Sequence, residues 1–420
     1  MKNWKDITHY VGFDWARDHH AVVIVNGQGE IVADFEFDHS LEGWTKFREK
    51  TAPWPHLAVA IETSQGAAVD QLLQYEYAVY PVNPVAAESY RKRKAPTGTK
   101  TDHIDGWGLA DALRMDGHNW KALQPMDPLT QQLRLLCRDE VVLIEQRTAL
   151  VNQLQQALVE YFPAALEAFD DWTHPFTWEF IIQFPTPDQL IKAGQRRWQN
   201  FLHKHKLWRP ETAEKRLAIF ARADLFKASD GITKAKSQLA LSLCKLLRTL
   251  QEQLNQYRKQ IEQLFKDHPD HDLFGSLPGA KDILAPRLLA GVGSDPQRYA
   301  NANVLQCFAG TAPIRFQSGQ INKVRMRWAC DTFLRHTVHL WANCFRKASA
   351  WGQTYYQKKR QQGMSHACAL RCLGQRLLKI VFKMLTDRKP YDAELHAQNQ
   401  TKHGSWVLNL INEKPTPESV

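Results

Sequence analysis

The alternation of apolar and polar residues predicts a sheet-containing domain at the start of the chain. Residues 31–37 alternate with a period of two, and residues 57–61 are apolar throughout, which is typical of a strand buried on both faces. The predicted elements are, in chain order, strands at 10–14, 21–25 and 31–37, a helix at 41–50 capped by Ser40, a strand at 57–61, a helix at 66–75 and a strand at 78–82. A three-stranded meander followed by alternating strands and helices predicts an α/β domain with a mixed sheet.

Two long helical stretches follow, and both repeat apolar residues at heptad-like spacing. Residues 129–161 contain no proline or glycine, and their leucines at 136, 143 and 150 are seven positions apart. In the stretch 229–268 the apolar residues are three or four positions apart, at Leu239, Leu243, Leu246, Leu250, Leu254, Tyr257, Ile261 and Leu264. This pattern predicts a coiled coil, formed either as an antiparallel hairpin within one chain or against another subunit. Residues 162–228 are then an insertion at the tip of the hairpin.

The pattern of apolar and polar residues changes again after Pro269, and the new pattern predicts a mostly helical domain. Amphipathic stretches at 332–350 and 366–386 predict two helices, and the last thirty residues, which contain several prolines, predict a loosely ordered tail. The predicted domains are an α/β domain at 1–125, a coiled-coil region at 126–268, a helical domain at 269–388 and a tail at 389–420.

Composition and charge narrow the possible classes of protein. The 420 residues are 44% hydrophobic and 23% charged, which excludes a disordered or fibrous chain. Lys and Arg (54) outnumber Asp and Glu (44), and the resulting charge of +10 favours a polyanionic partner. A mean hydropathy of -0.46 and the lack of an 18-residue apolar run argue against a membrane-spanning helix and a membrane partner. With no apolar leader segment and no paired CxxC framework, we expect a cytoplasmic protein with reduced thiols.

Four acidic residues lie where a two-metal site would need them. Asp14 lies in the first predicted strand, and Glu62 directly follows the fourth. Asp102 and Asp105 lie in the first turn of a further predicted helix, and their spacing places them on one face. In a ribonuclease-H-like sheet the first and fourth strands are neighbours, so the four acids converge and suit two Mg²⁺ ions in phosphoryl transfer. Singly, each acid has an ordinary explanation as a turn residue or a complement to a helix dipole, so the prediction depends on the set.

Four segments of the chain resemble the DEDD transposases of bacterial insertion sequences, the one-hundred-and-ten family, which are relatives of the Piv DNA invertase. The segments are Gly12–Ala16, Ile61–Gly66, Val82–Pro84 and Thr99–Asp105, and the resemblance covers the first 160 residues and residues 270–386. It implies that the N-terminal domain has a ribonuclease-H fold similar to the Holliday-junction resolvase RuvC. It also implies that the domain binds divalent metal, Mg²⁺ or alternatively Mn²⁺, through Asp14, Glu62, Asp102 and Asp105.

The same resemblance implies a catalytic serine in the C-terminal domain. The family setting, Ala-Pro followed by Ser-Gly, matches residues 312–319, where four residues separate Pro313 from Ser318, so that Ser318 is the expected nucleophile. A serine hydroxyl needs activation, and because no histidine lies in this segment, we expect a metal held by the carboxylates to supply it. Family members are thought to be recombinases guided by a structured bridge RNA that pairs with target and donor DNA. The resemblance further implies dimers and tetramers, in which the serine of one subunit completes the metal site of another.

Basic side chains near both motifs are the expected contacts to nucleic-acid phosphates. Those close to the aspartate pair are Arg91, Lys92, Arg93, Lys94 and Lys100, and those close to the serine are Arg315, Lys323, Arg325 and Arg327. Arg315 is the candidate for stabilising charge that develops during the reaction. Further basic residues between 196 and 209 alternate with Trp and His, which suits either RNA contacts or a solvated helical surface.

The predicted function is therefore a site-specific DNA recombinase that moves an insertion sequence and forms a phosphoserine intermediate. One alternative is a junction-resolving or RNA-processing nuclease, which would use the metal site and would not need Ser318. A second alternative is a nucleic-acid-binding scaffold, or a relative of actin-like sugar kinases that shares the sheet topology. The kinase version is disfavoured because the chain lacks paired glycine-rich phosphate loops at the required places.

Overall fold

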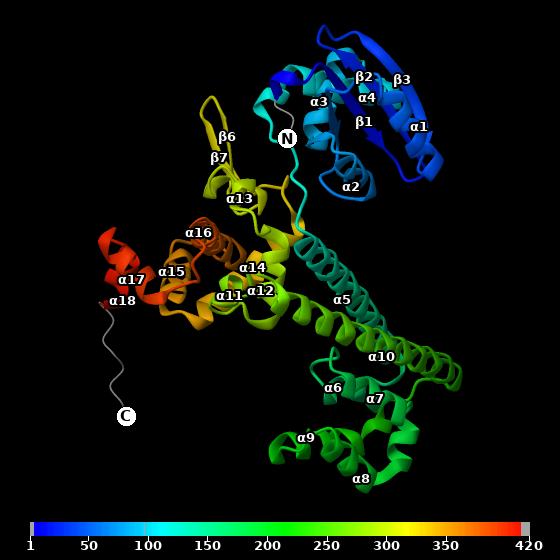
Figure 1. The fold of residues 1–420 in the computed structure, drawn as a ribbon. Coiled ribbons are helices and arrows are strands. Elements are labelled where there is room, and N and C mark those ends of the chain that lie inside the picture. The colour runs from blue at the N-terminus through cyan, green and yellow to red at the C-terminus, as the bar shows by residue number, and fades with distance from the viewer. Residues whose placement is uncertain (1–3, 96, 413–420) are drawn as a thin grey trace. The chain divides into compact units, whose positions relative to one another are not determined.

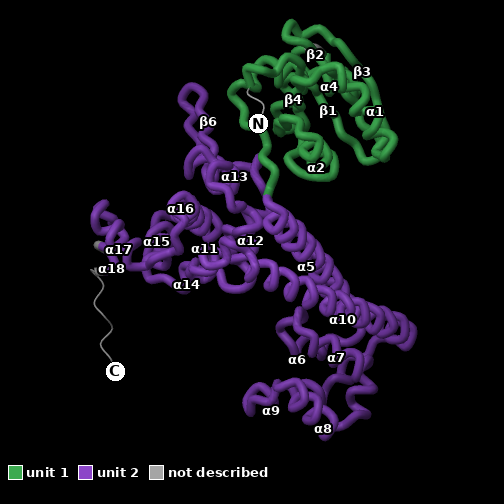
Figure 2. Tube along the Cα trace, viewed as in Figure 1, with its two compact units in different colours: residues 1–126 green, residues 127–420 purple. Residues whose placement is uncertain are grey.

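The chain forms two compact units, residues 1–126 and residues 127–420 (Figure 2). The computed structural model describes residues 4–95 and 97–412, apart from the side chains of Lys94, Asn409 and Asn412. None of the helices in these ranges has the length and apolar content needed to span a bilayer.

The first unit is built on a mixed five-stranded sheet (Figure 1). Its strands are β1 His9–Trp15, β2 His19–Asn26, β3 Ile31–Asp38, β4 Leu57–Ile61 and β5 Ala78–Pro81. Their spatial order is β3-β2-β1-β4-β5, with antiparallel pairing among the first three and parallel pairing from β1 through β4 to β5. The central residues of β1 and all of β4 are buried, as expected for apolar strands with helices on both faces. The predicted strands and the mixed α/β character are confirmed.

Helices cover both faces of this sheet. The helical elements are the short 3-10 helices η1 Trp4–Asp6 and η2 Gly117–Asn119, and the α-helices α1 Leu41–Thr51, α2 Ala67–Gln74, α3 Pro84–Lys94 and α4 Asp102–Asp116. On one face α1 packs Phe47 against Phe13, with ring centroids 5.8 Å apart. On the other face α4 contributes Leu109 and Leu113 to a buried cluster. The Ser40 hydroxyl accepts a hydrogen bond from the Gly43 N–H and caps α1, as predicted.

In the second unit, two long helices pair as an antiparallel hairpin. They are α5 Pro128–Tyr161 and α10 Asp230–Asp267. Arg258 bonds to Glu140 at 3.1 Å, and Lys236 bonds to Glu160 at 2.7 Å. Residues late in α5 therefore meet residues early in α10, which is the antiparallel arrangement. Of the two pairings that the leucine pattern left open, the structure has the one within a single chain.

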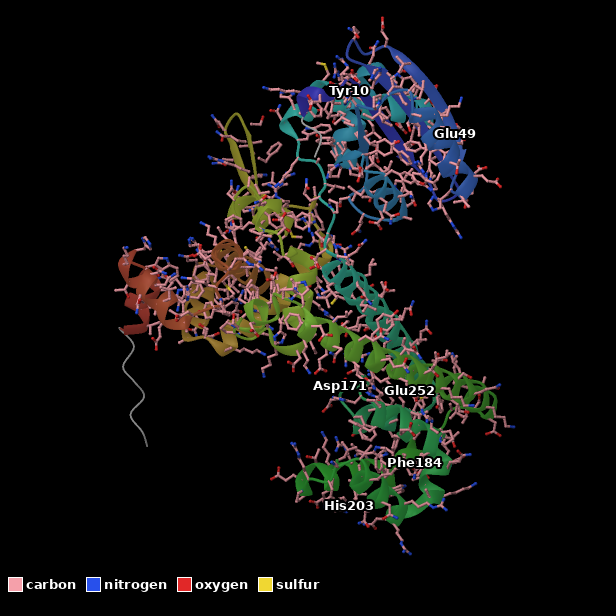
Figure 3. All side chains as sticks on the ribbon, viewed as in Figure 1. Tyr10, Glu49, Asp171, Phe184, His203 and Glu252 are labelled. Carbon is pink, nitrogen blue, oxygen red and sulfur yellow. The ribbon has the colours of Figure 1, made fainter. Side chains whose placement is uncertain are left out.

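The insertion at 162–228 is a helical subdomain with its own aromatic core. It consists of α6 Pro163–Ala168, α7 Pro175–Gln183, α8 Pro187–Lys204, α9 Pro210–Ala221 and the 3-10 helix η3 Ala223–Leu225. Phe184, between α7 and α8, is buried in this core together with Trp172 and Trp178 (Figure 3). The same cluster includes Leu154 of α5 and Leu243 of α10, so the core of the subdomain is continuous with the hairpin.

The remainder of the second unit is mostly helical, with one two-stranded hairpin. Its elements are α11 His271–Gly275, α12 Lys281–Val292, η4 Pro296–Arg298, α13 Ala302–Phe308, β6 Ile314–Ser318, β7 Ile321–Arg325, α14 Thr332–Ala348, α15 Ala350–Gln361, α16 His366–Asp387, α17 Ala393–Lys402 and α18 Trp406–Asn412. The two predicted amphipathic helices are confirmed as α14 and α16. The stretch predicted as one helix at 332–350 ends at Ser349, because the Ser349 side chain caps the separate helix α15.

The prediction of a loosely ordered tail at 389–420 is wrong for its described part. Residues 393–402 and 406–412 are helical, while residues 413–420 lie outside the described residues. Trp406 stacks on Tyr355 with ring centroids 5.6 Å apart, and Val407 is buried in the core of this unit. These two apolar side chains pack the segment against the rest of the unit. The prolines of the segment alone had indicated a loosely ordered tail.

Candidate active site

Asp14 and Glu62 lie side by side at the ends of two adjacent parallel strands. In the pairing of β1 with β4, Phe13 is the partner of Ile61. Asp14 and Glu62 are the next residues along these two strands, so each follows a buried apolar residue at the same level of the sheet. Both carboxylate-bearing side chains are half-buried. The structure therefore brings together the first two of the predicted acids.

The start of α4 brings the second pair of acids to the same edge. Thr101 caps this helix by accepting a hydrogen bond from the Ile104 N–H, which places Asp102 and Asp105 in its first turn. The approach depends on Gly12 of β1, because a Cβ there would lie 1.7 Å from the carbonyl oxygen of Gly106. Only a residue without a side chain allows α4 to pack this closely on the strand.

We call the four acids the acid cluster (Asp14, Glu62, Asp102 and Asp105). Their electrostatic interactions show that they lie close to one another. Burial raises the pKa of Asp14 to about 6, and the charges of Asp105, Asp102 and Glu62 contribute to that rise. Burial and the charge of Asp105 also raise the pKa of Glu62. Lys100 opposes both shifts, so it lies close enough to act as a counter-charge. These interactions show that the other three acids lie near Asp14.

Arg91 is bound to the acid cluster. Its Nη1 lies 3.1 Å from Oδ1 of Asp105, and both side chains are mostly buried. The contact arises because α3 packs on α4 at Gly108, where a Cβ would lie 3.2 Å from the Arg91 backbone. The predicted phosphate contact Arg91 is therefore a partner of Asp105 in this structure.

Two other basic residues of α3, Lys92 and Arg93, lie close to acidic side chains. Lys92 bonds to Glu88 at 2.8 Å on an exposed helix face, and Arg93 lies 3.5 Å from Asp111. Lys94 is in the last turn of α3, and its side chain lies outside the described residues.

The donor chemistry of the acid cluster fits a divalent metal, although the side chains are not arranged as a finished site. Among the described residues, no group of three or more Asp, Glu, His or Cys side chains stands ready to coordinate one ion. Four carboxylates are nevertheless the hard oxygen donors that Mg²⁺ and Mn²⁺ prefer, and the pKa of Asp14 is raised first by burial and then by the charges of the other three. One oxygen of Asp105, Oδ1, is engaged by Arg91, so this atom would be free for a metal only if that ion pair opened.

Ser318 lies in the second unit at the tip of the hairpin β6–β7, here called the serine hairpin (residues 314–325). Ser318 pairs with Ile321, which leaves Gly319 and Gln320 as a two-residue turn. Gly319 has a φ of +54°, a conformation that favours glycine in such turns. All ten strand residues are exposed, including Phe316, which is 45% exposed. The predicted nucleophile is thus fully accessible.

The pairing register separates the basic residues of the serine hairpin onto two faces. Phe316 pairs with Lys323 and Ile314 pairs with Arg325, and since side chains alternate along a strand, these cations share the face of Ser318. Lys323 is the diagonal neighbour of Ser318, about 7 to 8 Å away between backbone positions.

Two of the basic residues have other partners. Arg315 lies on the opposite face of the serine hairpin, where its Nε donates to Oδ1 of Asn322 at 3.0 Å. Arg327 donates to the carbonyl oxygen of Ala312 at 3.3 Å and closes the foot of the hairpin. The expected role of Arg315 beside the serine therefore lacks support from its position.

Comparison with known proteins identifies the family. Residues 11–163 match a family model described as a transposase, and residues 271–357 match one described as transposase IS116/IS110/IS902 family. The mini-circle putative transposase for IS117 of Streptomyces coelicolor is 30% identical over 402 residues, which cover 93% of this chain and 97% of that protein.

Two further proteins are similar to this chain over part of its length. An uncharacterized 42 kDa protein of the insertion element IS900 from Mycobacterium paratuberculosis is 29% identical over 73% of this chain and 75% of its own length. The pilin gene-inverting protein of Moraxella bovis is 24% identical over 50% of this chain and 62% of its own length. The chain therefore belongs to the IS110 family of transposases, which are enzymes that act on DNA.

Proposed function

We propose that this transposase cuts and rejoins DNA through a phosphoserine intermediate on Ser318, assisted by divalent metal at the acid cluster and guided by a bridge RNA. The observation that carries the proposal is the convergence of Asp14, Glu62, Asp102 and Asp105, seen in the raised pKa of Asp14. The order of the sheet, with β1 next to β4, supports a RuvC-like unit.

The acid cluster would hold Mg²⁺, or Mn²⁺ in its place. Bound there, the metal would activate the attacking hydroxyl and stabilise charge on the phosphate and the leaving oxygen. Asp14 and Glu62 supply donors from the sheet, whereas Asp102 and Asp105 supply donors from one helical turn. If Asp105 turned toward a metal, Arg91 would lose this partner and its guanidinium would be available to a DNA phosphate.

The covalent step is balanced without any co-reactant. The Oγ of Ser318 forms a bond to phosphorus, the bond from phosphorus to a sugar oxygen breaks, and the serine proton passes to the departing sugar hydroxyl. In the reverse direction, a hydroxyl of another strand attacks the phosphoserine and returns a proton to Ser318. Because one phosphodiester replaces another, strands are exchanged and rejoined without ATP. Lys323, on the face of Ser318, is positioned to neutralise the phosphate during both steps.

The decisive experiment compares Ser318→Ala with the parent on a strand-exchange substrate. We expect the variant to lose at least about 10³-fold in recombination rate and to form no covalent protein–DNA adduct, while its DNA binding persists. Ser242→Ala, which alters an exposed serine of α10, is the matched control and should recombine normally. Normal recombination by Ser318→Ala would favour the alternative, a nuclease that uses only the acid cluster.

RNA guidance and assembly need their own measurements. The positive net charge of +10 suits polyanionic partners, whether DNA or RNA. Sequencing of the RNA that copurifies with the protein should yield one defined structured species, and random fragments would reduce the proposal to a recombinase that works without a guide. Light scattering should give dimers or tetramers, the states in which the serine of one subunit serves the acid cluster of another.

A further inference from the structure

A cavity of about 230 Å³ lies at the foot of the serine hairpin, inside the second unit. Its walls come from the first half of α14 and the first half of α16. Thr311, just before β6, and Met326, just after β7, also line it, so the cavity touches both ends of the hairpin that carries Ser318. The acid cluster and the serine motif do not include any of these lining residues.

The polar side chains that line the cavity are cationic or neutral. They are Arg335, His336 and His339 of α14 and Arg371 of α16, here called the cation pocket, with the hydroxyls of Thr311 and Thr332 beside them. Carboxylates are absent from the lining. A pocket with this lining has hydrogen-bond donors on several sides and suits an oxyanion.

The cations of this pocket lack acidic partners within the described part of the chain. Arg335 contacts the sulfur of Cys330 at 3.5 Å and the ring of Trp328, and no ion pair of Arg335 or Arg371 with a carboxylate is found among the described residues. The neighbouring acid Asp331 is occupied elsewhere, because Arg138 and Arg134 of α5 bind it at 2.6 and 3.4 Å. Its charge is therefore shared among other arginines.

The electrostatics of His339 agree with this geometry. Burial lowers the pKa of His339, and nearby cationic groups lower it further. Those groups are His366, Arg371 and His336. Mutual repulsion among positive groups without a compensating acid is a cost that a bound anion would remove.

We propose that the cation pocket binds a backbone phosphate of the nucleic-acid strand that runs along the serine hairpin. The inference rests on the membership of the chain in a family of DNA enzymes and does not depend on Ser318 being the nucleophile. The five residues of β6 span about 17 Å from the foot to Ser318. That length is greater than the distance between neighbouring phosphates of one strand. The pocket therefore holds a flanking phosphate and not the one that is cut.

Between the two ends, the serine hairpin offers a continuous track. Lys323 and Arg325 lie on the face of Ser318, between the tip and the cation pocket. A strand that enters the pocket with one phosphate can meet these side chains with the next ones. Binding at the foot then fixes the register of the strand relative to the serine, since phosphate contacts position a nucleic acid without reading its sequence.

The test measures how DNA affinity depends on salt for Arg371→Gln. Each phosphate neutralised by the protein contributes about 0.9 to the slope of log affinity against log salt, so the variant should lose about one unit of slope. The protein is the full chain, and the probes are a duplex DNA, a single-stranded DNA and a single-stranded RNA of equal length. The probe whose slope changes identifies the strand that occupies the pocket.

Controls keep this inference separate from the proposed function. Lys379→Gln removes the same charge from the same helix outside the pocket and should leave the slope unchanged. Ser318→Ala should also keep the parental slope, whether or not it recombines. An unchanged slope for Arg371→Gln with all three probes, or an equal loss for Lys379→Gln, overturns the inference.

A second variant covers the case in which Arg371→Gln fails to fold. His336 is an exposed member of the pocket, so His336→Glu should fold while it places a negative charge at the mouth. We expect about a tenfold or greater loss of affinity for the probe that occupies the pocket, because like charges face each other there. Parental affinity for every probe would contradict the inference.

Discussion

The acid cluster and the serine hairpin are held in place by different interactions. Asp14 and Glu62 follow buried residues of adjacent strands, and α4 is pressed onto the same strand through Gly12. The serine hairpin, by contrast, consists of two strands paired only with each other, and none of its ten strand residues is buried. An isolated pair of strands has marginal stability in water. One candidate site is thus fixed by packing, whereas the other depends on its own backbone pairing.

The two regions also differ in which interaction each one lacks. The acid cluster is held in place by packed strands and a helix, but its carboxylates repel one another, and a divalent cation would compensate their charge. The serine hairpin has accessible chemistry and cations, but its apolar side chains Phe316 and Val324 face solvent at 45% and 70% exposure. Exposed apolar groups flanked by cations are typical of surfaces that a partner covers. We infer that metal completes the first region and a bound strand completes the second.

The largest effect is expected where packing supports the acid cluster. Gly12→Ala would place a Cβ 1.7 Å from the carbonyl oxygen of Gly106 and force α4 away from β1. We expect a loss of at least about 3 kcal/mol in the free energy of unfolding of the first unit, measured by urea denaturation. Displacement of α4 should also abolish recombination, because Asp102 and Asp105 move with it.

The matching change in the serine hairpin should be mild. A Cβ at Gly319 meets nothing within 4 Å, so Gly319→Ala costs only the strain of its positive φ, about 1 kcal/mol. If the two glycine variants lost comparable amounts of unfolding free energy, the distinction between a packed and an unpacked region would be wrong.

An intermediate effect is expected from Asp14→Asn, which removes charge from the acid cluster. The pKa of Asp14 is raised from 3.8 to about 6, so between these values the folded state binds a proton that the unfolded state has lost. Without metal, the stability due to this group therefore falls as the pH rises from about 4 to 6. At pH 7.5 the metal-free variant should melt a few degrees higher than the parent.

Mg²⁺ is expected to reverse this order of stability. Mg²⁺ should raise the melting temperature of the parent more at pH 7.5 than at pH 5, because protons compete for Asp14, and it should raise that of Asp14→Asn little. Asp18→Asn changes an exposed aspartate of the same unit and serves as the control. A metal-free Asp14→Asn protein that is less stable than the parent at pH 7.5 would show that the acid cluster is not strained by its charge.

The sequence predicted the sheet strands, whose apolar residues follow a clear period, but it missed helix α3. The runs at 57–61 and 31–37 identified their strands because burial imposes the periods that were read. Helix α3 was missed because its sequence is dominated by polar and basic residues. Its start signal is present in the sequence, since Asn83 caps the helix and Pro84 occupies the first position.

The tertiary contacts at the candidate site could not be predicted from the sequence. Two glycines inside a predicted helix, Gly106 and Gly108, signal close packing, yet the spacing alone does not tell which element approaches them. The structure supplies β2 and β1 for the first and α3 for the second, and with α3 comes the pair of Arg91 with Asp105. Ser318 shows the other limit, because Ser-Gly is an ordinary turn and only the family resemblance singled it out.

The smallest effect on stability, and the sharpest test of the unpacked region, is expected from Phe316→Ser. Because this ring is exposed and contacts chiefly the Arg325 guanidinium, 5.1 Å above it, the free energy of unfolding should change by less than about 0.5 kcal/mol. DNA affinity should nevertheless fall several-fold, since the bound strand would lose a stacking surface beside Ser318. Ile232→Ser, at a comparably exposed apolar position of α10, should alter neither quantity. If Phe316→Ser instead destabilises the fold as a core substitution does, the serine hairpin is packed in solution and its contrast with the acid cluster disappears.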